Sequence, residues 1–112
     1  MMQKIQWTKD GINSLYKILE HYKSIAGENS AQQIYKKIMR EIDLLEMEEV
    51  MTKQIQELHD IRIYDVYELS IQPWKVYCKI QESNKKVFIL FVLDSRKKLE
   101  EILISKVIDS NV

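Results

Sequence analysis

The hydrophobic period of the sequence changes near the middle of the chain, and this change limits the folds that the chain can adopt. In the first half, apolar side chains recur every three to four positions, which predicts two amphipathic helices. The apolar side chains that recur in the first helix are Ile12, Leu15, Tyr16, Leu19 and Tyr22, and the buried stripe of the second is Ala31, Ile34, Ile38, Ile42 and Leu45. In the second half the period becomes two, which is typical of strands.

Three strands are predicted in that second half. Residues 63–71 alternate between apolar and polar side chains, with Tyr67, Leu69 and Ile71 on one face. Residues 74–80 alternate as well, with Trp74, Val76, Cys78 and Ile80 on one face. The unbroken apolar run Val87–Leu93 predicts a central strand that is buried on both faces.

The two ends of the chain complete the predicted fold. Residues 4–8 alternate and indicate a short first strand, and Leu99, Ile102, Leu103 and Val107 indicate a last amphipathic helix, followed by a frayed tail at 109–112. The order β-α-α-β-β-β-α predicts an α+β fold, in which an antiparallel sheet carries a helical hairpin on one face and is followed by a C-terminal helix. At 112 residues, we expect one domain that spans residues 1–112.

Composition excludes several classes of function. The 17 basic and 17 acidic residues balance, so the whole molecule has no general attraction to nucleic acid. One cysteine and two histidines cannot form a standard zinc site, and two glycines cannot form a phosphate-binding loop. We therefore predict no metal and no cofactor. Without an apolar signal core or a span of about 18 apolar residues, we expect a cytoplasmic protein with no membrane partner.

Two groups of basic residues are candidates for binding. Lys75, Tyr77 and Lys79 share one face of a predicted strand, where cations and a ring could contact phosphates and a base. The alternative is a solvated strand that lysines protect from pairing. A second group, Arg96, Lys97 and Lys98, directly follows the predicted central strand, and at a helix N-terminus it would form an anion site.

Three segments resemble the ParE/RelE superfamily of toxins from type II toxin–antitoxin systems, in the same order along the chain. They are "IQWTKDGINSLYKILEHY", "VYELSIQPWKVYCKI" and "VFILFVLDSRKKLEEIL". Arg96 and Lys97 match the terminal basic pair of the family pattern. Tyr67 stands where the family often has Arg, and Asp94 stands where it frequently has His.

The resemblance implies a toxin, and the ParE branch is favoured. That branch inhibits DNA gyrase by direct binding and is neutralised by a cognate antitoxin in a toxin–antitoxin hetero-oligomer. The RelE branch cleaves messenger RNA on the ribosome with a His or Tyr acid/base near its C-terminus, and no His or Tyr follows Tyr77 here. A non-enzymatic toxin is therefore favoured.

Two alternatives stay open. One is a RelE-type messenger-RNA endoribonuclease that would use Tyr77 and Arg96, and the other is an inactive homologue that only binds antitoxin. The antitoxin would be received by a positive sheet edge and an apolar groove beside the last helix. The residues predicted to bind the target or the antitoxin are all basic or aromatic: Arg96, Lys97, Lys98, Lys75, Tyr77, Lys79 and Arg62.

Overall fold

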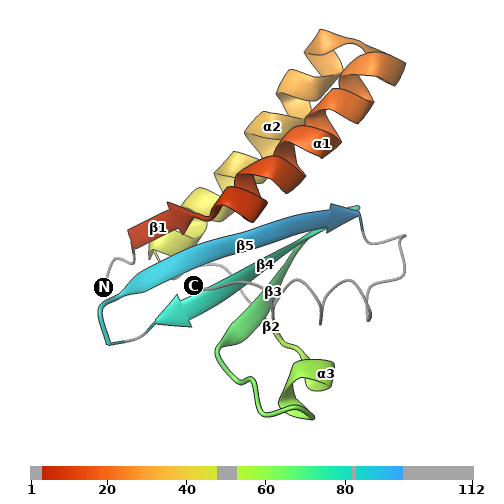
Figure 1. The fold of residues 1–112 in the computed structure, drawn as a ribbon. Helices are drawn as coiled ribbons and strands as arrows, with labels where there is room; N and C mark the ends of the chain where they lie inside the picture. The colour runs from red at the N-terminus through yellow and green to blue at the C-terminus, as the bar shows by residue number, and fades with distance from the viewer. Residues whose placement is uncertain (1–3, 48–52, 82, 95–112) are drawn as a thin grey trace.

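The computed structural model describes residues 4–47, 53–81 and 83–94, which form one sheet and a helical hairpin (Figure 1). The helical elements are α1 (Lys9–Ala26), α2 (Glu28–Asp43), the 3-10 helix η1 (Leu44–Met47) and the single-turn helix α3 (Gln56–His59). The strands are β1 (Lys4–Trp7), β2 (Lys53–Gln54), β3 (Val66–Ile71), β4 (Trp74–Gln81) and β5 (Lys86–Asp94). No described helix has both the length and the apolar character of a membrane span. The predicted C-terminal helix lies outside the described residues.

The sheet has five described strands in the order β1-β5-β4-β3-β2. The α+β class and the hairpin are confirmed, but the sheet is mixed and not antiparallel throughout. β1 pairs with β5 in parallel, with Trp7 opposite Ile89, while the other neighbouring strands are antiparallel. The chain passes through the hairpin from β1 at one edge of the sheet to β2 at the other, and the antiparallel strands β2 to β5 then bring β5 beside β1.

Helix α1 starts beside β5 because three small residues allow close approach. Thr8 caps the helix: its Oγ1 accepts a hydrogen bond from Gly11 N (3.0 Å) and donates one to Ile89 O (2.8 Å). At Gly11 a Cβ would lie 2.4 Å from Ile89 O, so only glycine fits. One turn later, Ser14 Oγ accepts a hydrogen bond from Val92 N (2.8 Å). These contacts fix α1 along β5.

The two helices of the hairpin are joined by a single residue. Gly27 has φ 91°, a conformation that side chains rarely adopt, and it ends α1 while preceding Glu28, the first residue of α2. Further along α2, Lys37 Nζ donates a hydrogen bond to Gln72 O (3.0 Å) in the turn between β3 and β4. Tyr22 of α1 meets Trp74 edge to face, with 5.8 Å between ring centroids. The hairpin is therefore attached to the sheet at both ends of α1.

Apolar side chains cover both faces of the sheet. On the hairpin face, the cluster centres on Ile38, Ile42, Val76, Cys78 and Ile89 and includes the predicted stripes of β3 and β4. On the opposite face, a second cluster joins the sheet to the segment around α3: Ile55, Leu58, Val66, Tyr77, Leu90 and Phe91. The predicted burial of β5 on both faces is confirmed. A bulge in β5 between Ile89 and Phe91 places Leu90 and Phe91 on the same second face.

The turn after α3 was not predicted from the sequence. Ile63 N donates to Leu58 O (2.8 Å) and Arg62 N donates to His59 O (3.0 Å), the paired bonds of a Schellman motif. Arg62 occupies the left-handed position, with φ 64°, where glycine is usual. A side chain there costs roughly 1 kcal/mol. Ile63 and Leu58 pack in the second cluster and anchor the turn.

Candidate interaction surface

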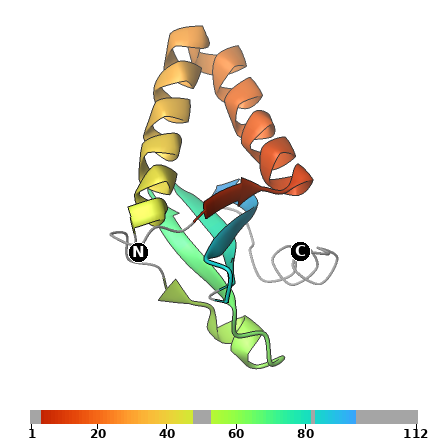
Figure 2. The ribbon, with the colours of Figure 1, turned by 90° about the vertical axis from the view of Figure 1, so that its left-hand side faces the viewer.

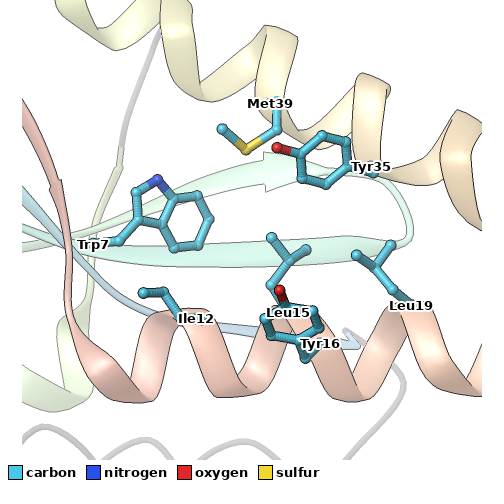
Figure 3. Close-up of a pocket in the computed structure, with 7 residues that line it drawn as sticks. All are labelled: Trp7, Ile12, Leu15, Tyr16, Leu19, Tyr35 and Met39. Carbon is cyan, nitrogen blue, oxygen red and sulfur yellow. The ribbon is translucent and has the colours of Figure 1, made fainter.

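An apolar groove lies between the two helices of the hairpin (Figure 3). It has a volume of about 310 Å³ and is lined by one residue of β1, four of α1 and two of α2: Trp7, Ile12, Leu15, Tyr16, Leu19, Tyr35 and Met39. Trp7 lies at one end, and Leu19 and Tyr35 lie toward the other. The groove is open because the helices separate toward the sheet, as Figure 2 shows.

Large side chains in this groove are exposed to solvent. Ile12 is 43% exposed, Tyr16 62% and Tyr35 46%. Contiguous apolar surface of this kind marks sites of protein association in soluble proteins. A groove between two helices accepts an amphipathic segment whose apolar side chains enter it at helical spacing, while the two phenols can hydrogen-bond at its rim.

Ile12 and Tyr16 belong to the periodic apolar residues that predicted α1, but the structure leaves both exposed to solvent. Leu15 is buried against the sheet, but Ile12 and Tyr16 face outward. The detectable signal was the width of the stripe. At 100° per residue, the apolar side chains of α1 span about 160° when Ile18 is included, well beyond the roughly 100° that one buried interface needs. The groove was predicted beside the last helix, which lies outside the described residues.

Tyr77 does not form the centre of an exposed stripe. Lys75, Tyr77 and Lys79 share a face, as predicted, but the Tyr77 ring is 1% exposed and packs on Phe91 with 4.9 Å between centroids. Burial raises the pKa of the phenol, and the carboxylates of Glu68 and Glu57 raise it further. The ring is therefore closed to base stacking, and the phenol does not ionise near neutral pH.

The two lysines beside Tyr77 are paired with carboxylates of the neighbouring chain segment. Lys75 Nζ lies 2.6 Å from Oε1 of Glu68, a buried residue on β3. Lys79 Nζ lies 3.8 Å from Oδ2 of Asp65. Because each ammonium faces a carboxylate, little positive potential remains on this face for a phosphate backbone. The predicted row is therefore a set of ion pairs around a buried ring.

The remaining predicted residues divide into two groups. Arg96, Lys97 and Lys98 lie outside the described residues. Arg62 is exposed at the turn after α3. The described ranges contain no group of three or more His, Cys, Asp or Glu residues arranged to hold a metal ion.

Cys78 is a structural residue of the hairpin-face core. Its side chain is fully buried, and burial raises the pKa of its thiol to about 12. A thiol with this pKa is not a nucleophile at neutral pH. Its Sγ–H donates a weak hydrogen bond to Tyr67 O, 3.7 Å away.

A family model described as "ParE toxin of type II toxin-antitoxin system, parDE" matches residues 5–99. The chain belongs to the ParE toxin family. This match covers the three segments that resemble the ParE/RelE superfamily, except for the last residues of the third segment. It follows that the protein is a toxin component of a type II toxin–antitoxin system. No curated protein matches the sequence.

Two solved structures resemble the fold. The chromosomal ParDE toxin–antitoxin system from P. aeruginosa has 18% sequence identity and a TM-score of 0.67, covering 83% of this chain and 96% of that chain. The toxin–antitoxin complex RelBE2 from Mycobacterium tuberculosis has 12% identity and a TM-score of 0.49, covering 84% and 99%. At such identity the first likeness supports the shared fold alone.

Tyr67, at the position where members of the ParE/RelE superfamily often carry Arg, contributes to the core of this ParE toxin. It lies on β3 opposite Cys78 and packs, partly buried, against the hairpin-face cluster. Because this side chain faces the hairpin, Tyr67 adds apolar contact on the interior side of the sheet.

Proposed function

We propose that this ParE-family toxin inhibits DNA gyrase by direct binding, and that a cognate antitoxin restrains it by laying an apolar segment in the groove between α1 and α2. The observation that carries the antitoxin part is the exposed apolar groove, with Ile12, Tyr16 and Tyr35 open to solvent. The gyrase part rests on family membership. The P. aeruginosa relative is a ParDE system, which supports a protein partner for the toxin.

Inhibition by binding is favoured over RNA cleavage because of Tyr77. A ribonuclease needs an accessible group that accepts a proton from the attacking hydroxyl. Tyr77 is buried and its pKa is raised, so it cannot serve as that group without a large rearrangement. The paired state of Lys75 and Lys79 also leaves this face poorly suited to an RNA backbone.

The proposal is tested with purified toxin in a gyrase supercoiling assay, with and without the antitoxin encoded beside it. We expect inhibition by the toxin alone and recovery of supercoiling when antitoxin is added. Induced expression in a bacterial host gives the complementary result, growth arrest with DNA damage and intact transcripts. Arrest with transcripts cut within codons would instead indicate an endoribonuclease. The absence of any arrest or inhibition would indicate an inactive homologue that only binds antitoxin.

A further inference from the structure

The turn after α3 presents an arginine in a backbone conformation that favours glycine. Arg62 has φ 64° at the left-handed position of the Schellman motif, and its backbone N–H bonds to His59 O. The turn itself is well fixed, because Ile63 and Leu58 bury its base in the second cluster.

Two exposed apolar side chains flank this arginine. Ile61 is 44% exposed and Tyr64 is 53% exposed. The Tyr64 ring meets the His59 ring edge to face, with 4.9 Å between centroids, so its orientation is supported from within the turn. A fixed turn with an exposed Ile, Arg and Tyr has the composition of the energetic centre of protein interfaces, where Tyr and Arg are enriched.

The charge of Arg62 is available for a partner. Within the described ranges no carboxylate lies within ion-pair distance of its guanidinium, whereas Lys75 and Lys79 are both paired. A guanidinium binds a carboxylate through two parallel hydrogen bonds. Of the nearby carboxylates, Asp65 is paired with Lys79, and Asp60 accepts a hydrogen bond from Gln56 Nε2 (3.1 Å). One guanidinium between exposed Ile61 and Tyr64 favours a protein partner over a nucleic acid, whose backbone is bound by several cations.

We propose that Ile61, Arg62 and Tyr64 form the target-contact surface of this toxin, and that it binds an apolar protein surface carrying an acidic side chain. This inference rests on the proposed function for the existence of a protein target, and it adds the place of contact. The surface lies at the opposite end of the molecule from the hairpin (Figures 1 and 2). The proposed target-contact surface and the groove proposed for the antitoxin are thus separate surfaces.

The decisive variant is Arg62→Gly, because it removes the side chain and relieves the backbone at the same time. We expect its thermal stability to equal or exceed that of the wild type, while the concentration needed to inhibit gyrase rises by at least about tenfold. Arg62→Asn, which also tolerates the left-handed conformation, should behave in the same way. Antitoxin affinity should stay within about twofold of wild type for both.

The matched control is Lys85→Gly. Lys85 is the other non-glycine residue with positive φ in the described ranges, at 55°, and it lies in the turn between β4 and β5. The substitution removes a cation and relieves the same kind of backbone conformation away from the proposed surface. We expect gyrase inhibition and antitoxin affinity unchanged. Equal loss of inhibition in Lys85→Gly and Arg62→Gly would overturn the assignment.

Growth arrest on induced expression separates this inference from the gyrase proposal. If the wild type arrests growth without inhibiting gyrase, the gyrase proposal fails, and loss of arrest in Arg62→Gly with intact transcripts still supports the surface. If Arg62→Gly keeps full inhibition or arrest, or weakens antitoxin binding instead, the surface proposal is wrong. Transcript cleavage that is lost in Arg62→Gly would assign the surface to RNA and overturn the protein partner. A wild type without gyrase inhibition or arrest overturns both proposals.

Discussion

At the residue scale, Gly11 has the most demanding position in the described fold. A methyl group there would lie 2.4 Å from Ile89 O, a backbone atom that also accepts hydrogen bonds from Thr8. In an unconstrained helix, replacing glycine by alanine stabilises by about 1 kcal/mol. Here the added methyl group would collide with Ile89 O and force α1 away from β5. We expect Gly11→Ala to lower the free energy of unfolding by ~1–3 kcal/mol in urea denaturation.

The control for this substitution is Asn13→Ala, at an exposed position of the same helix turn. It should be neutral or slightly stabilising, because it adds helix propensity without a new contact. A Gly11→Ala chain as stable as the wild type would contradict the close packing of α1 on β5.

Cys78 gives the stability of the protein a dependence on pH. Burial raises the pKa of the thiol from 9.0 to about 12, so above pH 9 the unfolded chain loses a proton that the folded chain retains. Stability from this group is fully present below pH 9 and is lost as pH rises toward 12. The loss is about 1.4 kcal/mol per pH unit at most. Denaturant unfolding between pH 8 and pH 10 should show a decline that is clearly smaller in Cys78→Ala. Tyr77→Phe should keep the decline, and a decline of equal slope in Cys78→Ala would assign it to other groups.

At the element scale, periodicity was sufficient to predict α1, α2, β3, β4 and β5. The stripes Ile34, Ile38, Ile42 and Trp74, Val76, Cys78 are strictly periodic, and each is buried as predicted. The direction of β1 could not be predicted, because the alternation of Lys4–Trp7 is the same in a parallel and an antiparallel strand. The elements that were not predicted are η1, β2 and α3, each too short for its period to be visible.

The groove between α1 and α2 leads to a prediction about antitoxin binding. Tyr16→Glu with Tyr35→Glu places two carboxylates in an apolar site without disturbing the core, because both rings are largely exposed. We expect the affinity for antitoxin, measured by calorimetry, to fall at least about tenfold. Lys17→Glu with Gln33→Glu, at exposed positions outside the groove lining, should have little effect. Similar losses in both pairs would point to overall charge in place of the groove.

At the scale of the whole molecule, the sequence predicted the family but only part of the candidate surfaces. Tyr77 was assigned to an exposed stripe because period two implies one buried face and one solvated face. The second cluster covers that other face. Its members Ile55, Leu58 and Ile63 come from a segment rich in charged residues, which obscured its apolar pattern. The exposure of Ile12 depends on how distant segments meet, which local pattern does not encode. The left-handed turn at Arg62 is local, but the sequence has no glycine there to indicate it.

The separation of the groove from the turn after α3 makes the two activities of the toxin separable. In Tyr16→Glu with Tyr35→Glu, the surface at Ile61, Arg62 and Tyr64 is intact, so the toxin should still arrest growth, and co-expressed antitoxin should no longer rescue the cells. In Arg62→Gly, antitoxin should still bind, but arrest should be lost. Growth curves with and without induced antitoxin measure both effects in the same host.

The combination of all three substitutions provides the internal check on this separation. Surfaces that do not share contacts contribute additively to binding, within about 0.5 kcal/mol. The triple variant should therefore bind antitoxin as weakly as the groove variant, Tyr16→Glu with Tyr35→Glu, and inhibit gyrase as weakly as Arg62→Gly. Its thermal stability should not fall below that of either variant. If the groove variant or Arg62→Gly weakens the binding of both partners, antitoxin and target contact a common surface. The antitoxin then acts by covering the target site directly.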